Sequence, residues 1–390
     1  MTTLRRRSRG TALVAVASVF GVLAAGCATF PEQTKAQWTE RPHLEPQAGP
    51  NPQVPGGGGG GGQRPGQQPS APVKPPEGCK DYNTNVVATC LSPVSAVAVL
   101  PDGKSALVAE RTTGRVLRVE EGSQDAKLVT TLPVDSTGGG GLTGLALSPT
   151  YREDNLIYAY ITTGSDNRVV RFAAKDVPKP VLTGIPRGSS NNAGALIRDR
   201  SGALLVATGN AGNAGAGADS GSLAGKLLRI NPSGKPAEGN PNSGSAVIAS
   251  GLYSPGGICT SLTGLIWITD RQPDRDVVFK LTLGQQLSAP AWTWPDKPGV
   301  GGCAAKSTGL GVALENATGV ADLAMAPTGA FTGQPRVSFK EFGRIRGGDL
   351  GPEEQWWVGT TNKDSGGKPV SSDDRALIIP PDSGGGTGVD

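Results

Sequence analysis

The stretch that decides the fold runs from Ser189 to Lys235 and reads SSNNAGALIRDRSGALLVATGNAGNAGAGADSGSLAGKLLRINPSGK. Two of its segments, Gly202–Gly209 and Lys226–Asn231, are rich in Leu and Val and have turn signals at their outer ends, so we predict that both are strands. A long loop of Gly, Asn and Ala separates them. The stretch therefore predicts two neighbouring strands of one sheet.

Weaker versions of this pattern recur along the chain. Each has an apolar strand, a turn, a second apolar strand, a polar loop and a third strand. They are Ser95–Glu120, Gly141–Phe172, Gly256–Leu283 and Gly348–Pro380. Three or four short antiparallel strands in roughly 40–50 residues is the period of a β-propeller blade. We therefore predict an all-β propeller of four-stranded antiparallel blades.

Three segments need a separate interpretation. Ser288–Asn316 breaks the repeat, and we interpret it as a long insertion between blades. The weak strands Ala321–Ala326 and Arg336–Phe339 are assigned to a fifth blade. Asn85–Leu91 is predicted to be a strand that completes the last blade, because closing the ring in this way removes an exposed sheet edge.

The N-terminus has the features of an export signal. Four arginines precede an apolar run from Ala12 to Ala25, which is too short for a transmembrane anchor. Leu23–Cys27 is similar to a bacterial lipobox, in which the cysteine is lipidated and becomes the mature N-terminus. We predict a signal peptide over residues 1–26 and a lipid anchor on Cys27 that holds the protein on the extracytoplasmic face of the cell membrane. An ordinary cleaved signal with an incidental cysteine is the alternative.

The segment that follows the signal is rich in Pro, Gly and Gln and includes an unbroken glycine run at 56–62. Such a composition cannot bury enough apolar surface to fold. The predicted organisation is therefore a signal at 1–26, the lipidated Cys27 with a disordered linker at 27–78, a propeller at 79–382 and a flexible tail at 383–390.

The charge of the chain argues against a nucleic-acid partner. The formal net charge is +4, and removal of the four signal arginines leaves the mature chain without net charge. A closed ring of blades with balanced charge predicts a monomer. The expected partners are the membrane, through Cys27, and an envelope protein or glycan.

Four cysteines follow Cys27. An even number in an exported chain indicates two disulfides, and proximity in the sequence favours Cys79–Cys90 and Cys259–Cys303 among the three pairings that four cysteines allow. A metal site is the weaker alternative, because no CxxC motif occurs and the only histidine is His43.

An ordered set of short motifs covers most of Val86–Pro380. The motifs are LTGLALSP from Leu142, the segment Gly194–Asn210, GKLLRINP from Gly225, SPGG from Ser254, Trp294-Pro295 and RIR from Arg344. Together they resemble the soluble quinoprotein glucose and aldose-sugar dehydrogenases, the glucose/sorbosone dehydrogenase family. The resemblance implies a six-bladed propeller that carries pyrroloquinoline quinone (PQQ) and calcium on one face.

Most of the residues that carry this family's chemistry are absent. The place of its general-base histidine holds Asn191, and an amide cannot take a proton at neutral pH. The Arg-Asn pair that contacts quinone and substrate aligns with Tyr253 and Ser254, and a quinone-contacting glutamine aligns with Gly139. We therefore expect no catalytic residue at these positions.

Two arginines of the pattern are present. Arg344 and Arg346 are two residues apart on a predicted strand, so their side chains point to one face. In the family this pair binds the carboxylates of the cofactor, and here it is a candidate anion site. The alternative is a pair of solvated surface arginines.

The calcium position is also altered. The family holds the metal partly through backbone carbonyls of a Gly-Pro step, and Gln272-Pro273 stands at that place, with Asp270, Asp274 and Asp276 around it. Carbonyl ligands need no particular side chain, so a hard cation is compatible with this step. Three acids on a loop are more often solvated charge, and with most quinone contacts missing we expect neither PQQ nor calcium to be bound.

Three functions are consistent with these residues. We favour a lipid-anchored envelope propeller that binds or scaffolds and is catalytically degenerate, because hydride abstraction from a sugar needs a positioned base. The alternative is an active PQQ- and calcium-dependent aldose sugar dehydrogenase with a relocated base such as Asp199 or Asp349. A metal-dependent lactonase would need several convergent ligands, which we cannot assemble from the sequence.

Overall fold

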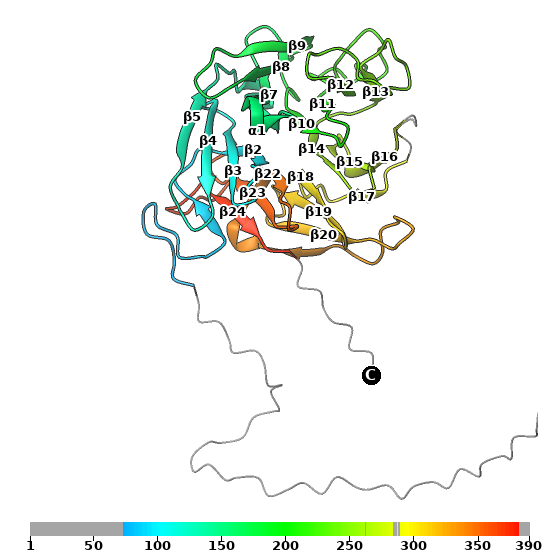
Figure 1. Ribbon diagram of the computed structural model, residues 1–390. Coiled ribbons are helices and arrows are strands. Elements are labelled where there is room, and N and C mark those ends of the chain that lie inside the picture. Colours follow the sequence, from blue (N-terminus) through cyan, green and yellow to red (C-terminus); the bar gives the residue numbers. More distant parts are fainter. Residues whose placement is uncertain (1–72, 262, 284–286, 288, 382–390) are drawn as a thin grey trace, which may run out of the picture. The chain divides into compact units, whose positions relative to one another are not determined.

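The computed structural model describes residues 73–381 apart from 262, 284–286 and 288. These residues form six four-stranded antiparallel sheets arranged in a ring (Figure 1). The innermost strand of each sheet contacts the innermost strands of both neighbouring sheets, which closes the ring. The predicted six-bladed β-propeller is confirmed.

The strands are given for each blade from the centre outward. Blade 1 has β2 (Val94–Val99), β3 (Ser105–Glu110), β4 (Arg115–Glu120) and β5 (Lys127–Thr131), and blade 2 has β6 (Leu142–Leu147), β7 (Ile157–Thr162), β8 (Asn167–Phe172) and β9 (Lys179–Ile185). Blade 3 has β10 (Gly194–Arg198), β11 (Leu204–Thr208), β12 (Lys226–Ile230) and β13 (Val247–Ser250), and blade 4 has β14 (Pro255–Thr260), β15 (Ile266–Arg271), β16 (Asp276–Leu281) and β17 (Trp292–Trp294). Blade 5 has β18 (Val300–Ala305), β19 (Gly309–Leu314), β20 (Val320–Ala324) and β21 (Arg336–Ser338), and blade 6 has β22 (Ile345–Leu350), β23 (Trp356–Thr360), β24 (Ala376–Ile379) and β1 (Val86–Ala88). The described helices are all short: η1 (Thr137–Gly139), α1 (Tyr151–Asp154) and η2 (Lys340–Phe342).

The apolar core is divided into six clusters, and each lies between two neighbouring blades. The largest buried side chains belong to these clusters, among them Trp267, Trp356 and Trp357. Because each blade buries both of its faces against its neighbours, its strands are apolar on both sides. This explains the nearly continuous Leu and Val runs of β11 and β12, the two strands predicted from the opening stretch.

The interpretation of Ser288–Asn316 as an insertion is wrong. This segment contains the outer strand of blade 4, β17, and the two inner strands of blade 5, β18 and β19. Strand β18 reads VGGCAA and has no large side chains except Val300, so it lacks an apolar signal. Its small residues have a packing reason, because a Cβ atom on Gly301 would lie 2.7 Å from the carbonyl oxygen of Arg346 in the next blade.

The first and last segments of the propeller are joined in blade 6. Strand β1 pairs antiparallel with β24, as predicted for the segment Asn85–Leu91. Arg375, just before β24, reaches back to the carboxylate of Asp81 at 3.2 Å and also binds Asp373 at 2.8 Å. All three side chains are buried, so this is an ion-pair network that fastens the N-terminal segment onto the last blade.

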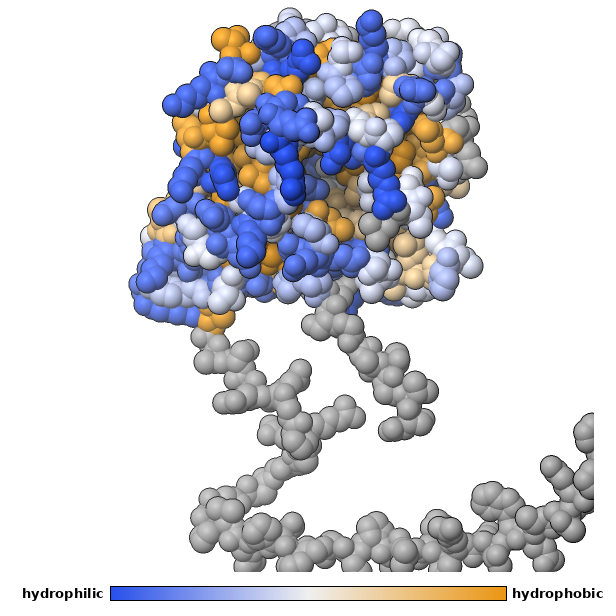
Figure 2. All heavy atoms as spheres, in the orientation of Figure 1, coloured by the Kyte–Doolittle hydropathy of each residue, from blue (hydrophilic) through white to orange (hydrophobic). Residues whose placement is uncertain are grey.

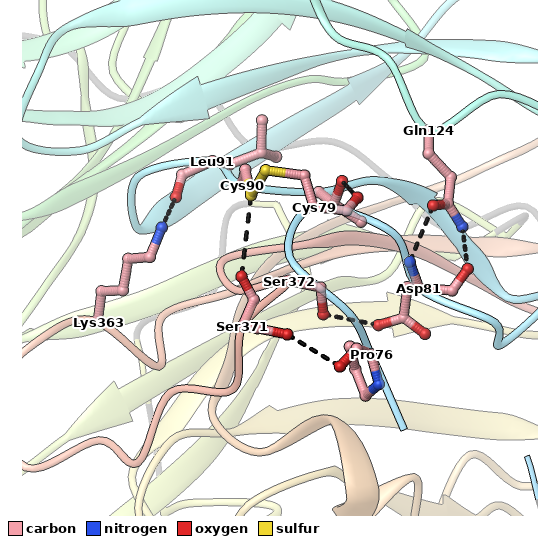
Figure 3. Close-up of a disulfide and its surroundings, with 10 residues drawn as sticks. Pro76, Cys79, Asp81, Cys90, Leu91, Gln124, Lys363, Ser371 and Ser372 are labelled. Atoms are coloured by element: carbon pink, nitrogen blue, oxygen red, sulfur yellow. Dashed lines mark hydrogen bonds between the residues drawn. A yellow bond between two sulfur atoms is a disulfide. The ribbon is translucent and has the colours of Figure 1, made fainter. Parts of the chain in front are cut away.

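Both predicted disulfides are confirmed. Cys79–Cys90 spans strand β1, and hydrogen bonds from Ser372 to Asp81 and between Asp81 and Gln124 surround it (Figure 3). Cys259–Cys303 joins β14 to β18, the inner strands of blades 4 and 5. It therefore links two neighbouring blades.

The predicted signal peptide, Cys27, most of the predicted linker and the tail at 383–390 lie outside the described residues. Within the part that the structure describes, no helix has the length and apolar character needed to cross a membrane. The lipid anchor stays a prediction.

We expect the disulfide between blades 4 and 5 to stabilise the fold more than the N-terminal one. Its cysteines are 44 residues apart, against 11 for Cys79–Cys90. Chain-entropy arguments assign about 4 kcal/mol to a loop of the larger size and about 3 kcal/mol to the smaller one. Urea unfolding of Cys259→Ala/Cys303→Ala and Cys79→Ala/Cys90→Ala should reproduce that order, and a larger loss in the second variant would contradict it.

Candidate functional site

The inner strands divide the propeller into two faces. We call the face at which these six strands begin the first face, and the face at which they end the second face. Because neighbouring strands in a blade are antiparallel, the loop after the second strand of each blade also lies on the first face. Residues that follow β3, β15, β19 or β23 are therefore brought together with the residues that precede β22.

A single buried carboxylate lies at the centre of the candidate site. Glu315, immediately after β19, is only 5% exposed. Its Oε1 atom accepts a hydrogen bond from Arg271 Nη1 at 3.1 Å and lies 3.3 Å from Arg346 Nη1, and its Oε2 atom lies 3.5 Å from Arg344 Nη2. Three guanidinium groups thus share one carboxylate. The expectation that Arg344 and Arg346 point to one place is confirmed.

A fourth arginine belongs to the same cluster. Arg111, immediately after β3, binds Asp364 through Nε at 3.2 Å and Nη2 at 2.7 Å, and it donates from Nη1 to the carbonyl of Gly140 at 3.1 Å. Its charge also acts on Glu315 and Arg346. We call Arg111, Arg271, Arg344, Arg346, Glu315 and Asp364 the arginine cluster. With four guanidinium groups and two carboxylates, it has two positive charges in excess.

The protonation states preserve this excess at neutral pH. Burial raises the pKa of Glu315, but the charges of Arg346, Arg271 and Arg344 outweigh burial and hold the pKa below its usual value. Burial lowers the pKa of Arg346 to about 10, against the opposing effect of Glu315. Within the described residues, Arg344 Nε is buried and has no hydrogen-bond partner. The cluster therefore offers positive charge to an anion.

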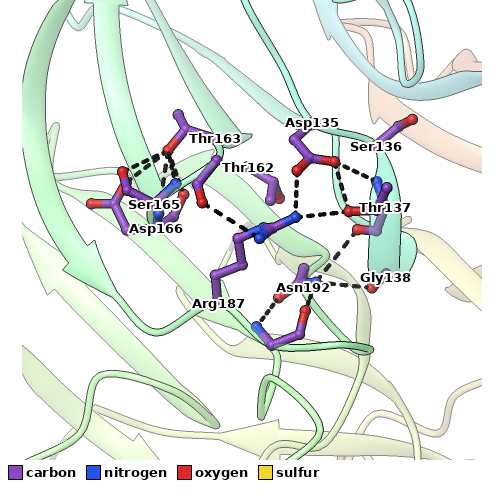
Figure 4. Close-up of polar contacts among 12 residues, drawn as sticks. Asp135, Ser136, Thr137, Gly138, Thr162, Thr163, Ser165, Asp166, Arg187 and Asn192 are labelled. Carbon is purple, nitrogen blue, oxygen red and sulfur yellow. Dashed lines mark hydrogen bonds and ion pairs between the residues drawn. The ribbon is translucent and has the colours of Figure 1, made fainter.

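The loop at the start of blade 2 is rigidly held beside this cluster. Gly139, at the place of the family's glutamine, ends the 3-10 turn η1 and has φ +76°, with nothing within 4 Å of where a Cβ would be. The buried side chain of Asn192 donates to the carbonyl of Gly138 at 3.2 Å, and Arg187 donates to Thr137 Oγ1 at 2.8 Å and binds Asp135 (Figure 4). The space beside Gly139 is therefore open.

Asn191, at the position that the sequence assigns to the family's general base, lies before β10. It has a positive φ of 53°, and its Nδ2 donates to Asn210 Oδ1 at 2.9 Å. Asn210 is buried, and its backbone N–H donates to the carbonyl of Tyr253 at 2.9 Å. This chain of amides is a hydrogen-bonded contact between loops and contains no group that can accept a proton at neutral pH.

Tyr253 and Ser254 precede β14 and are held by a buried carboxylate. The Oδ2 atom of Asp270 accepts from the backbone N–H of Tyr253 at 2.9 Å, and Oδ1 accepts from that of Ser254 at 2.7 Å. Burial raises the pKa of Asp270 to about 6, although these N–H groups and Gln272 act in the opposite direction. Asp270 therefore orders the loop that carries the two residues aligned with the family's Arg-Asn pair.

The Gln272-Pro273 dipeptide, at the position of the family's calcium site, already contacts a positively charged side chain of this chain. The carbonyl oxygen of Pro273 accepts a hydrogen bond from Lys297 Nζ at 2.7 Å. Asp270 and Asp276 bind backbone N–H groups, and Gln272 donates its side-chain amide to Asp270. Among the described residues no group of three or more His, Cys, Asp or Glu side chains is arranged to hold a metal. A calcium ion at Pro273 would have to displace the Lys297 ammonium group.

Asp199 and Asp349, which the sequence suggested as substitute general bases, lie on the face opposite the arginine cluster. Asp199 follows the last residue of β10 and pairs with Arg229 at 2.7 Å. Asp349 is the fifth residue of β22 and accepts from the backbone N–H of Val99 at 2.8 Å. Both belong to the second face, whereas Arg344 and Arg346 belong to the first. The length of the inner strands separates the two groups.

Sequence reasoning missed Arg111, Arg271 and Glu315. All three stand at the same point of the repeat, at the end of the second strand of blades 1, 4 and 5. Aligning the blades with one another would reveal charged residues at this point. Glu315 could not be found in this way, because its blade was interpreted as an insertion.

Known proteins share both sequence and structure with this chain. Residues 91–276 match the family described as Glucose / Sorbosone dehydrogenase. A PQQ-bound aldose sugar dehydrogenase from Streptomyces coelicolor is 29% identical with a TM-score of 0.71, and the match covers 75% of this chain and 95% of that one. An oxidoreductase of Thermus thermophilus described as a glucose dehydrogenase is 30% identical with a TM-score of 0.69, over 75% of this chain and 98% of that one.

A more distant structure has the same fold. A soluble aldose sugar dehydrogenase of Escherichia coli, solved in its apo form, is 21% identical with a TM-score of 0.66, over 76% of this chain and 99% of that one. No curated protein sequence matches this chain significantly.

The buried Asp270 predicts a measurable pH dependence of stability. Its pKa in the folded protein is about 6, above the ordinary value of 3.8, so the folded state holds this proton more tightly than the unfolded state. The resulting stabilisation is complete below pH 3.8, is about 2 kcal/mol at pH 4, and is lost as the pH rises through about 6. Asp270→Asn cannot titrate. Between pH 4 and pH 7 the wild-type protein should therefore lose about 2 kcal/mol of unfolding free energy that Asp270→Asn does not lose, as measured by urea unfolding at the two pH values. An identical pH dependence in both proteins would contradict the assignment.

Proposed function

This chain belongs to the glucose/sorbosone dehydrogenase family, and from that membership we propose that it is a binding protein that retains the family's anion-binding arginines and lacks its catalysis. The observation that carries the proposal is the combination of two features on one face. The arginine cluster has excess positive charge, while the position of the general base holds Asn191, tied to Asn210. A ligand can be held there, but a proton cannot be abstracted from it.

The arginine cluster is suited to a ligand with carboxylate groups. Arg344 and Arg346 approach the cluster from β22, and Arg111 and Arg271 approach from blades 1 and 4. The guanidinium groups of Arg344 and Arg346 are held on Glu315 and remain partly exposed, so they could donate charge-assisted hydrogen bonds to a carboxylate. Arg344 and Arg346 are therefore the residues that would hold the carboxylates of PQQ or of another organic anion.

The residues of the first face are suited to the carboxylates of PQQ, but not to its catalytic use or to calcium. When bound, PQQ supplies the electron acceptor for oxidation of a sugar hydroxyl carbon. This chemistry also needs a base, and the chain's only histidine is His43, outside the predicted propeller. Calcium does not fit, because Lys297 donates to the carbonyl of Pro273 and the nearby carboxylates bind backbone N–H groups. We therefore derive no catalytic step for this protein.

The proposal includes attachment to the cell envelope. It rests on the basic and apolar segment before Cys27 and on the Pro- and Gly-rich segment after it. Two disulfides in the propeller agree with an exported protein, because such bonds persist in oxidising compartments. A tethered propeller with an anion-binding face would act as a receptor or scaffold for an envelope molecule.

A titration of the chain from residue 73 onward with PQQ, with and without calcium, tests the proposal. We expect saturable binding that does not depend on calcium and no bleaching of the quinone by any aldose. Replacing Arg344 and Arg346 by Gln should weaken binding at least tenfold, because a hydrogen bond to a charged group contributes about 1.5–3 kcal/mol. Calorimetry gives the affinity, and absorbance reports turnover.

The matched control is Arg336→Gln, which alters an exposed arginine at the start of the outer strand β21 and should leave PQQ binding unchanged. Aldose-dependent bleaching in the wild-type protein would refute the loss of catalysis and establish the alternative, an active PQQ-dependent aldose sugar dehydrogenase. PQQ binding that requires calcium would refute the claim that calcium does not fit at Pro273. An affinity that Arg344→Gln/Arg346→Gln leaves unchanged would remove the anion site.

A further inference from the structure

The channel enclosed by the six inner strands contains a cavity of about 480 Å³. Its lining comes from all six blades and extends beyond the ends of β10 and β22 to Arg200 and Glu354. None of the four arginines of the arginine cluster lines it. The cavity therefore belongs to the second face, opposite the site described above. Figure 2 shows a hollow in the middle of the ring.

The mouth of this cavity has unpaired positive charge. Arg198 ends β10, Arg200 follows two residues later, and both are exposed. For neither guanidinium group does the described part of the chain contain a hydrogen bond or ion pair. Arg198 is nevertheless close enough to Asp349 to oppose the effect of burial on the pKa of that carboxyl. Both arginines line the cavity, so their donors are available to a ligand.

The carboxylates at the mouth are already engaged. Asp349 accepts from the backbone N–H of Val99 at 2.8 Å and from its neighbour Leu350 at 2.9 Å. Glu354 accepts from the backbone N–H of Ser307 at 3.0 Å and from its hydroxyl at 2.8 Å. The formal charges of the mouth balance, but its carboxylates are occupied by hydrogen bonds while both guanidinium groups keep their donors free, so the donors at the mouth can bind an anion.

The walls below the mouth combine polar surface with apolar side chains. Val99, Leu147, Ile197 and Leu350 end or nearly end their inner strands and are half-buried, each from a different blade. Deeper in the channel the lining consists largely of Ala and Gly residues. An apolar chain that entered the mouth would contact these four side chains.

We propose that the channel binds a small amphipathic organic anion, with its carboxylate or phosphate on Arg198 and Arg200 and its apolar chain among Val99, Leu147, Ile197 and Leu350. The cavity volume lies within the range of roughly 300–1,000 Å³ that is usual for small-molecule sites. This site is independent of the function proposed for the first face, because the two share no residue.

Calorimetry with octanoate, below its micelle concentration, tests this inference on the chain from residue 73 onward. Octanol has the same chain without the charge, and acetate has the charge without the chain. We expect saturable octanoate binding with one site per protein, and binding of octanol and acetate at least tenfold weaker. Octyl phosphate distinguishes a carboxylate site from a phosphate site through its affinity relative to octanoate.

Variants locate the site. Arg198→Gln/Arg200→Gln should weaken octanoate binding at least tenfold, and Thr260→Trp, at the half-buried end of β14, should obstruct the mouth and weaken it similarly. Arg336→Gln is again the matched control and should bind like the wild-type protein. The proposal is overturned by an absence of saturable octanoate binding, by equal affinity for octanol, or by an unchanged affinity in the double variant. Arg198→Gln/Arg200→Gln should leave PQQ binding on the first face unchanged. A failure of the channel proposal can therefore be told apart from a failure of the proposed function.

Discussion

The close approach of six inner strands around one axis is the constraint on which this structure depends. Backbone lies against backbone there: a Cβ atom on Gly256 would be 2.3 Å from the carbonyl oxygen of Val300, and one on Gly347 would be 2.6 Å from the backbone of Ser95 and Ala96. Larger residues at these points would force the blades apart. The glycines therefore permit ring closure, and ring closure in turn leaves a channel open at the second face and gathers six sets of loops on the first.

This constraint also explains which parts of the fold could be predicted from the sequence. Strands β11 and β12 are buried on both faces and are rich in Leu, Val and Ile, so their signal is strong. Strand β18 is equally buried, but the close approach of backbones at the axis requires small residues, so its composition resembles that of a loop. The small residues of β18 thus give a weak apolar pattern, although they decide how closely blades 5 and 6 pack.

The same limit applies to the candidate site. Arg344 and Arg346 could be paired from their spacing, because two residues on one strand share a face. Their counterion could not, since Glu315 lies some thirty residues earlier and in another blade. Contacts of this kind are set by the ring and not by neighbouring sequence. The first face has a charge distribution suited to an anion, and Asn191 and Asn210 on the same face are joined by a hydrogen bond.

The Cys79–Cys90 bridge has a mechanical consequence. Strand β1, which closes the ring, lies inside the loop that this bridge encloses, and so does Asp81 with its bond to Arg375. A pulling force applied to the chain ahead of Cys79 is carried across the sulfur atoms directly to Cys90 and then into the inner strand β2. Neither β1 nor its pairing with β24 is under load along this path. Tension on the N-terminal side therefore cannot peel the closing strand from blade 6 while the bridge is intact.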